Sequence, residues 1–396
     1  MKILLASILL ILLVGAGAIY YFISSTYRTV PGNTDSPKII TLSSPSSTFN
    51  SQNQDTPAET IVAEGLDTPW AIAFLPNGDM LVTERKGTLR LVDKNGNLQQ
   101  MPVATLENVK EIGEGGLLGI ALHPDFSSNS FVYFYYTYSS EGDNTFNRVV
   151  RMKYANNSLT DEEIIVDKIP GASNHNGGRI KFGTGGFLFI TTGDAQNPSF
   201  AQDKNSLAGK ILRVTDEGKP APGNPFNNEV YSYGHRNPQG IAWDEDGNLY
   251  ETEHGPSGGT LGTGNDEINL IEYGNNYGWP EIQGDQTREG MVTPIKNSTP
   301  SVAWAPGGAA FYNNSLFFGG LRGQTLYEAV IENNKQSLQG HKVIDFKEHF
   351  KGKYGRIREV IAGPDGMLYI TTSNRDGRGI PKPEDDRIIR INLQKL

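Results

Sequence analysis

Two polar segments flank a pair of short hydrophobic strands near the middle of the sequence. They are 234–240 (Gly-His-Arg-Asn-Pro-Gln-Gly) and 253–256 (Glu-His-Gly-Pro), and an Asp-Gly turn separates the strands. Because such strands run antiparallel, the start of the first and the end of the second lie at the same end of the pair. Arg236, Asn237 and the Gly255–Pro256 main chain are therefore predicted to face one place, as in a ligand site.

Other polar residues stand at matching distances from turn glycines elsewhere in the chain. They are His175, eleven residues before Gly186; Arg236, eleven before Gly247; Arg356 and Arg358, ten and eight before Gly366; and Asp194, eight after Gly186. Two guanidiniums two residues apart share one face of an extended segment, which is usually a solvated face. Their register with His175 favours a site for a polyanionic ligand that is bound bidentately.

The elements that would position these residues form a repeat. Short aromatic strands followed by a glycine turn occur at Trp70–Phe74, Arg179–Phe182, Ile241–Trp243 and Glu359–Ile361, and looser copies at Leu118–His123 and Ala309–Tyr312 make six units. Later hydrophobic runs at Leu89–Val92, Arg148–Met152, Ile211–Val214 and Ile388–Ile391 supply outer strands. Six sheet repeats predict an all-β, six-bladed β-propeller, in which equivalent loops circle one mouth of the central channel. A β-sandwich would explain the short strands but not the repeated frame.

Most of the six histidines also have a structural interpretation. His123 is typical of a turn, His341 and His349 of a surface, and His235 and His254 of loop-bracing residues. His175 lies in a loop with little apolar content, and its register with Arg236 and Arg356 favours a functional role there. The segment that begins at Asp266-Glu267 and continues through 276–280 (Asn-Tyr-Gly-Trp-Pro) is rich in oxygen ligands suited to calcium, although an ordinary acidic turn would have the same composition.

From about Leu66 to Ile391, the chain resembles the soluble quinoprotein glucose and aldose sugar dehydrogenases, which use pyrroloquinoline quinone (PQQ). The motifs that carry the resemblance are 113–119 (Gly-Glu-Gly-Gly-Leu-Leu-Gly), 123–126 (His-Pro-Asp-Phe), 174–179 (Asn-His-Asn-Gly-Gly-Arg), 192–194 (Thr-Gly-Asp), 234–240, 253–256, 266–270 (Asp-Glu-Ile-Asn-Leu), 276–280 and 356–360 (Arg-Ile-Arg-Glu-Val). Each motif alone is weak evidence for the family, but the presence of all of them in the same order is strong evidence.

The resemblance implies catalytic roles for three residues. His175 matches the general base that takes the proton of the anomeric hydroxyl, with hydride passing to the quinone, and Asp194 matches the carboxylate that orients it. Arg236 matches a residue that stabilises the oxyanion developing on the quinone.

The resemblance also implies the ligands of the cofactor and of two calcium ions. PQQ would be bound by Glu114, Arg236, Asn237, Arg322, Arg356 and Arg358. The main-chain oxygens of Gly255 and Pro256 match ligands of the calcium that binds PQQ and polarises its carbonyl. Glu267 and Tyr277 match ligands of a second, structural calcium.

Three residues depart from the family pattern. Glu114 stands where better-known members carry Gln, and a carboxylate beside an anionic cofactor is unfavourable unless it is protonated or paired. Arg322 stands where they carry Lys, which keeps the charge but changes the geometry. Ser373 stands where the glucose enzyme carries Asp.

The ends and the composition bound the remaining possibilities. Residues 1–28 contain the apolar run Ile3–Ile23, long enough for a membrane anchor, with cleavage as a signal peptide left open. Residues 29–59 are predicted to be a flexible Ser/Thr/Pro-rich linker, and 60–396 the propeller. The protein is therefore expected outside the cytoplasm, anchored or secreted. A net charge of −9 without a basic block argues against nucleic-acid binding, and the absence of cysteine excludes a disulfide.

Three functions compete. The first is a PQQ-dependent aldose dehydrogenase, whose partners would be an aldose and an external electron acceptor such as a quinone, a cytochrome or a dye. The second is a calcium-dependent propeller lactonase, against which the arginine set argues. The third is a non-catalytic binding propeller of the hedgehog-interacting type. Loss of His175 and Arg236 would have favoured it, but both residues are present. The sugar and the oligomeric state, monomer or dimer, stay open.

Overall fold

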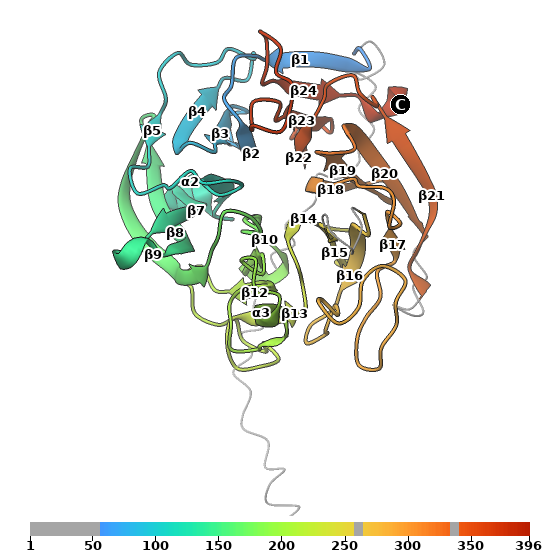
Figure 1. Cartoon of the computed structure of the whole chain (residues 1–396). Coiled ribbons are helices and arrows are strands. Elements are labelled where there is room, and N and C mark those ends of the chain that lie inside the picture. Colours follow the sequence, from blue (N-terminus) through green and yellow to red (C-terminus); the bar gives the residue numbers. More distant parts are fainter. Residues whose placement is uncertain (1–55, 257–263, 333–339) are drawn as a thin grey trace, which may run out of the picture. The chain divides into compact units, whose positions relative to one another are not determined.

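The computed structural model describes residues 56–256, 264–332 and 340–396. In these residues the chain forms six four-stranded sheets, and Figure 1 shows them arranged as blades around a central axis. The predicted six-bladed β-propeller is confirmed, and the alternative β-sandwich is wrong.

Each blade is given from its innermost strand outward. The blades are β2 (Pro69–Phe74), β3 (Met80–Glu84), β4 (Thr88–Val92) and β5 (Ala104–Thr105); β6 (Leu117–Leu122), β7 (Phe131–Ser139), β8 (Thr145–Ala155) and β9 (Ser158–Pro170); β10 (Ile180–Phe182), β11 (Leu188–Thr192), β12 (Lys210–Val214) and β13 (Val230–Tyr233); β14 (Pro238–Trp243), β15 (Leu249–Glu253), β16 (Glu267–Ile271) and β17 (Lys296–Asn297); β18 (Pro306–Tyr312), β19 (Ser315–Gly320), β20 (Thr325–Glu332) and β21 (Lys342–His349); and β22 (Ile357–Ala362), β23 (Leu368–Thr372), β24 (Ile388–Ile391) and β1 (Glu59–Ala63). Among the connections are the short helices α2 (Phe126–Asn129) and α3 (Ser199–Gln202) and the 3₁₀ turns Glu141–Asp143, Thr184–Gly186 and Leu393–Lys395.

The last blade is closed by the first strand of the chain. β1 pairs with β24, so that Glu59 lies opposite Ile391 and Thr60 opposite Arg390 (Figure 1). The hydrophobic runs predicted as outer strands are the third strands of their blades, and a fourth strand lies outside each of them. Among the fourth strands of the six blades, β5 and β17 are only two residues long, which is too short to show a hydrophobic period in the sequence.

The repeated frame has a local cause. In four of the six blades the turn from the first to the second strand contains a glycine at positive φ, such as Gly247 at +87° and Gly366 at +74°. Side chains are strained in this left-handed region, so glycine is favoured there. The inner strands β2 and β14 are buried along five of their six residues because neighbouring blades cover both of their faces. Successive aromatic residues of β7, Tyr133 to Tyr136, are fully buried.

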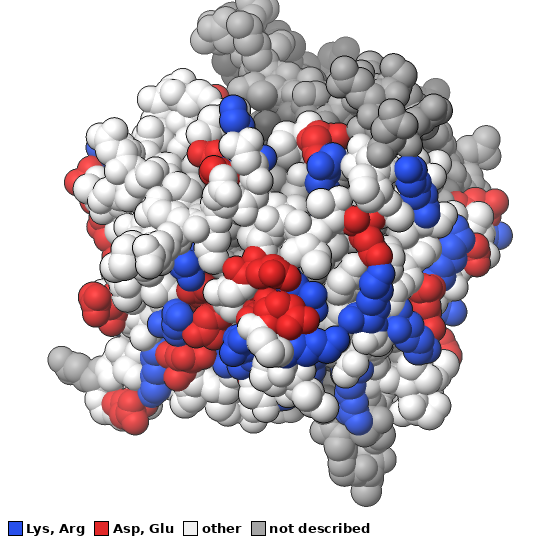
Figure 2. All heavy atoms as spheres, turned by 90° about the horizontal axis from the view of Figure 1, so that it is seen from above, with Lys and Arg blue, Asp and Glu red and all other residues white. Residues whose placement is uncertain are grey.

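The edge of the propeller near β1 and β24 carries charges of both signs. Figure 2 looks onto this edge and shows Lys and Arg interspersed with Asp and Glu, without a large patch of one sign. The predicted anchor Ile3–Ile23 and most of the predicted linker lie outside the described residues. Within the described ranges, no helix has the length and apolar character needed to cross a membrane.

Candidate active site

The loops that carry the predicted residues meet at one end of the propeller. His175, Arg236 and Arg356 precede the inner strands β10, β14 and β22, while Asp194 follows β11. Main-chain hydrogen bonds tie these loops together: the N–H of Asp194 donates to the carbonyl of Arg236 at 2.8 Å. The side-chain oxygen of Asn237 accepts the N–H of Gly177 at 3.0 Å. The structure therefore brings these loops together at one mouth of the channel, as the repeat spacing predicts.

His175 and Asp194 form a bonded pair. Nδ1 of His175 lies 2.7 Å from Oδ1 of Asp194, whose other oxygen accepts the indole N–H of Trp279 at 2.8 Å. Asp194 is 1% exposed, whereas the His175 side chain retains 18% exposure. An ionised carboxylate only accepts hydrogen bonds, so Nδ1 of the neutral imidazole carries the proton and Nε2 keeps a lone pair. This is the arrangement of an oriented base.

Glu114 lies against the same loop and is paired. One carboxylate oxygen accepts the main-chain N–H of His175 at 3.2 Å, and the other accepts the Arg378 guanidinium at 2.5 Å. Burial alone would raise the pKa of Glu114, but the neighbouring ring of His254, the Arg378 guanidinium and the His175 N–H together lower it to about 2. Glu114 is therefore ionised near neutral pH and compensated by Arg378, a partner that the sequence interpretation had not identified.

Arg236 and Asn237 are held by their main chains and keep side-chain donors without partners. Both main-chain N–H groups donate to Oε2 of Glu253, at 2.6 and 3.3 Å. Nη1 of Arg236 donates to the carbonyl of His254 at 3.2 Å, and its guanidinium lies 5.3 Å from the centre of the Trp279 ring. Among the described residues, Nε of Arg236 and Nδ2 of Asn237 are buried without a hydrogen-bond acceptor. Buried orphan donors are rare and indicate a place for an acceptor-rich ligand.

Arg356 and Arg358 share a carboxylate that sequence reasoning missed. Nε and Nη2 of Arg356 lie 2.8 Å from Oδ2 of Asp376, and Nη2 of Arg358 lies 3.9 Å from the same atom. Nη1 of Arg358 donates to the side chain of Gln239 at 2.6 Å, but its Nε is a buried donor without a partner within the described chain. Burial, only partly offset by Asp376, lowers the pKa of Arg358 to about 9.

The three residues that depart from the family pattern have different surroundings. Glu114 is paired, as described above. Ser373 donates its hydroxyl to Oδ2 of Asp376 at 3.2 Å, so a carboxylate stands beside the arginines although position 373 carries none. Arg322 lies in the turn after β19 at the same end of the propeller, and its side chain is exposed rather than buried with Arg356 and Arg358.

His254 lies inside the mouth. Its Nε2 is 2.8 Å from the carbonyl of Pro306, so Nε2 is the donor and Nδ1 has a lone pair. Burial, together with the nearby charges of Arg236 and Arg358, lowers the pKa of His254 to about 3, against the opposing effect of Glu114. The ring is therefore neutral near pH 7. The sequence analysis predicted only that His254 braces its loop. It did not predict that the ring lies near the charged side chains of Glu114, Arg236 and Arg358.

The predicted calcium ligands Gly255 and Pro256 are buried at the end of β15. The main-chain N–H of Gly255 donates to Oδ1 of Asp266 at 2.9 Å, while the other carboxylate oxygen accepts from Trp304 and Ala305. Asp266 therefore fixes the main chain at Gly255.

Behind the mouth, Glu267 belongs to a buried acidic cluster on β15 and β16. Its members are Glu251, Glu253, Glu267 and Asn269, and Nδ2 of Asn269 lies 3.0, 3.3 and 3.4 Å from one oxygen of Glu251, Glu253 and Glu267 respectively. A ligand atom of His235 lies within 4.8 Å of one from Glu251 and one from Glu253. Burial and the charge of Glu253 raise the pKa of both Glu251 and Glu267, the latter to about 8.

The acidic cluster has oxygen atoms that lack partners. Oε1 of Glu251 and Oδ1 of Asn269 are buried with no hydrogen bond to any described residue. An amide group offers only two hydrogens to the three carboxylates that surround Asn269, so the cluster has more acceptors than donors. The residues present therefore fit a divalent cation with oxygen ligands. The hydroxyl of Tyr277 bonds instead to Leu270 and Glu272, so only the main-chain oxygen of Tyr277 could join such a site.

Comparisons with known proteins find relatives over most of the chain. The family model for glucose/sorbosone dehydrogenases matches residues 66–388. The aldose sugar dehydrogenase YliI of Escherichia coli is 35% identical over 350 residues, which cover 80% of this chain and 90% of that protein. The quinoprotein glucose dehydrogenase B of Acinetobacter calcoaceticus is 32% identical over 269 residues, covering 59% of this chain and 54% of that one.

Solved structures show the same architecture. The PQQ-bound aldose sugar dehydrogenase of Streptomyces coelicolor superimposes with a TM-score of 0.76 and is 40% identical, covering 85% of this chain and 99% of that chain.

Proposed function

The chain belongs to the glucose/sorbosone dehydrogenase family, and we propose that it oxidises an aldose at the anomeric carbon to the lactone with PQQ as cofactor. The observation that carries this proposal is the bonded pair of His175 and Asp194, beside the unpartnered donors of Arg236 and Asn237. A base and a set of donors that lack an acceptor are the two parts that oxidation at a hydroxyl-bearing carbon needs. The PQQ-bound relative supports the choice of cofactor.

His175 acts as the base in this proposal. Nε2 takes the proton of the anomeric hydroxyl, and the resulting imidazolium is stabilised by Asp194 through Nδ1. Trp279 and the main-chain N–H of Gln196 hold the carboxylate in place. Hydrogen bonds from these fixed donors keep Asp194 from rotating away, so the imidazole stays in one tautomer.

The donors of the mouth would hold the cofactor. Arg356 and Arg358 bind its carboxylates, Arg322 reaches it from the exposed turn, and Arg236 and Asn237 contact the quinone side. When bound, PQQ supplies the acceptor for the hydride that leaves the anomeric carbon. Negative charge that develops beside Arg236 would be stabilised by a buried guanidinium that is already in position.

Calcium is proposed at two places. The first is the mouth, where the carbonyls of Gly255 and Pro256 would be ligands and Asp266 holds the main-chain N–H of Gly255. The second is the acidic cluster of Glu251, Glu253, Glu267 and Asn269, with the main chain of Tyr277. Its orphan oxygens support a cation there.

Reconstitution tests the function directly. Purified protein is incubated with PQQ and calcium, and reduction of a redox dye is scored over a panel of aldoses. Activity that depends on both additions and is lost in His175→Gln is the expected result. Binding of PQQ without dye reduction by any aldose would instead indicate the non-catalytic propeller. Hydrolysis of lactones without PQQ would indicate the calcium-dependent lactonase.

The location and partners are also part of the proposal. The apolar run Ile3–Ile23 would tether the enzyme outside the cytoplasmic membrane or be removed on secretion, with the linker between it and the propeller. Electrons would then pass to an external acceptor, a quinone or a cytochrome, for which the dye substitutes in the assay.

A further inference from the structure

A second cavity opens at the end of the channel opposite the candidate active site. It has a volume of about 470 Å³ and is lined by the last residues of the inner strands, from all six blades. The loops of the active mouth precede these strands, so the cavity lies at the other end of the same strands. Its size falls within the roughly 300–1,000 Å³ of pockets that bind small molecules.

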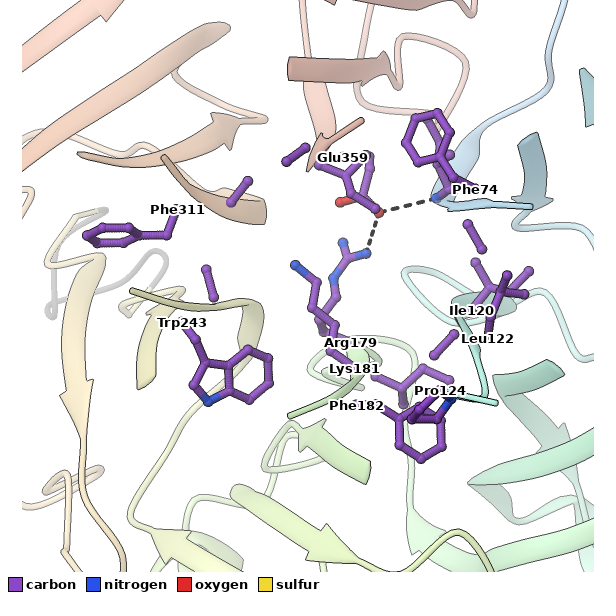
Figure 3. Close-up of a pocket in the computed structure, with 18 residues that line it drawn as sticks. Phe74, Ile120, Leu122, Pro124, Arg179, Lys181, Phe182, Trp243, Phe311 and Glu359 are labelled. Carbon is purple, nitrogen blue, oxygen red and sulfur yellow. Dashed lines mark hydrogen bonds and ion pairs between the residues drawn. The ribbon is translucent and has the colours of Figure 1, made fainter. Parts of the chain in front are cut away.

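The wall of this cavity is mostly aliphatic and includes four aromatic side chains. Phe74, Phe182, Trp243 and Phe311 project from four different blades around it, as Figure 3 shows. All four are only partly buried, although each packs against one further aromatic ring. Aromatic side chains that surround an open cavity favour a flat ligand, because stacked or edge-on rings add to the burial of apolar area.

The inner end of the cavity carries an excess of one positive charge. Three charged residues line it: Arg179, Lys181 and Glu359. Nη1 of Arg179 bonds to Oε2 of Glu359 at 2.6 Å, with both side chains almost fully buried (Figure 3). This pairing leaves the charge of Lys181 uncompensated within the lining.

Both cations have N–H groups to spare. Nζ of Lys181 donates to the carbonyls of Ile241 and Ala309, at 2.9 and 2.8 Å, and an ammonium has a third donor. Nη2 of Arg179 is buried without a partner among the described residues, and Arg179 is only 2% exposed. Burial and the charge of Arg179 lower the pKa of Lys181 to about 8, against the opposing effect of Glu359. A bound anion would offset the cost of keeping this amine charged.

The cavity is separate from the active mouth. Nε of Arg179 donates to the main-chain carbonyl of Gln239 at 3.0 Å, and its guanidinium lies 4.3 Å from the Trp70 ring centre. Lys181 bridges the main chains of β14 and β18. These contacts form a layer across the channel between the two ends.

We propose that this cavity binds a small aromatic carboxylate, with its ring against Trp243 and the phenylalanines and its carboxylate on Lys181 and Arg179. The ring matches the walls, and the single negative charge matches the excess charge of the lining. Neither the resemblance nor the active-site geometry accounts for this cavity, and the proposal does not depend on the sugar dehydrogenase activity.

Isothermal titration with 2-naphthoate tests the proposal, with 2-naphthamide as the uncharged ligand of the same shape. Naphthoate should bind at least about tenfold more tightly, the contribution of a hydrogen bond to a charged group. Lys181→Met should remove this preference while leaving the amide's affinity unchanged. Lys219→Met, an exposed lysine of the same blade, is the matched control and should change nothing.

Two further variants separate a loss of binding from a loss of folding. Because Lys181 ties two inner strands together, Lys181→Met could fold poorly. Phe311→Ala leaves these bonds in place and should weaken both ligands. Arg358→Ala, at the opposite mouth, should leave naphthoate binding intact. Equal affinities for acid and amide, loss of binding in Arg358→Ala, or no binding at millimolar concentration would each overturn the proposal.

Discussion

The main-chain N–H of Arg236 donates to Oε2 of Glu253 at 2.6 Å, and this bond joins the candidate active site to the acidic cluster. Glu253 reaches the neighbouring N–H of Asn237 with the same oxygen. Its other oxygen lies among Glu251, Glu267 and Asn269. The loop that presents Arg236 and Asn237 therefore rests on the group of carboxylates proposed to hold a cation, so loss of the cation should disturb both stability and cofactor binding.

Chelation should lower the melting temperature of the protein, because a cation that binds only the folded state stabilises it by about 2.7 kcal/mol at a hundred times its dissociation constant. Glu251→Gln should reduce the calcium-dependent rise in melting temperature, measured by differential scanning fluorimetry. Glu245→Gln, on an exposed turn of the same blade, is the control. If Glu251→Gln instead stabilised the protein and calcium had no effect, the cluster would hold protons rather than a metal.

His175→Gln should leave PQQ bound while sugar oxidation falls by about 10²–10⁴-fold, the usual contribution of a general base. Single-turnover reduction of bound PQQ by sugar measures the chemical step separately from folding. Asp194→Asn should also slow this step. The asparagine amide is neutral and can turn its NH₂ group towards Nδ1, so it neither stabilises the imidazolium nor fixes the tautomer of His175. Near-normal reduction of bound PQQ in His175→Gln would mean that another residue is the base. Glu114 is a poor candidate for that role because its pKa is about 2.

Arg356→Ala and Arg358→Ala should each weaken PQQ binding by roughly 10- to 100-fold, as hydrogen bonds to charged groups contribute about 1.5–3 kcal/mol. Titration of the PQQ-free protein gives the affinity. Arg390→Ala is a suitable control because Arg390 lies on β24, outside the mouth, where it pairs with Asp365. Unchanged affinity in both test variants would place the cofactor carboxylates elsewhere.

His254→Gln should make the protein less sensitive to acid. The folded-state pKa of His254 is about 3, whereas an unperturbed histidine titrates near 6.5. Between these values the unfolded chain binds a proton that the folded protein does not, so stability falls as the pH is lowered from 6.5 towards 3, by up to about 1.4 kcal/mol per pH unit. Urea unfolding at several pH values measures the slope, which should be smaller in the variant. Equal slopes would mean that His254 is protonated in the folded state.

Cell fractionation should find the protein outside the cytoplasm, in the membrane fraction or in a secreted form that begins in the linker. The apolar run Ile3–Ile23 is the reason for this expectation. Recovery of the full-length chain in the cytoplasm would contradict it, and deletion of residues 1–28 supplies the soluble control.

The blades could be predicted because their signals are local. A turn glycine such as Gly247 and the apolar strands beside it lie within a few residues, so the spacing alone indicates which loops share an end. The short strands β5 and β17 have no such signal. They form only because a neighbouring strand offers unpaired main-chain groups.

The partners within the site were harder to predict because they depend on contacts distant in sequence. Asp376 meets Arg356 only after its long loop has folded back over the mouth. Arg378 reaches Glu114 across 264 positions of the sequence. Glu251 and Glu253 carried a usable signal, since residues two apart on a strand share a face. Only the strand register reveals that this face meets Asn269 and Glu267.

The pairing of β1 with β24 has a consequence for biosynthesis. Of the propeller's strands, β1 is the first to be made, but its partner β24 is the last. The early blades can fold as they appear, whereas the ring can close only after β24 has been made. Until then β1 and the inner faces of the incomplete blades stay open to chaperones and to other nascent chains, and the strand pairing with the largest sequence separation completes the fold.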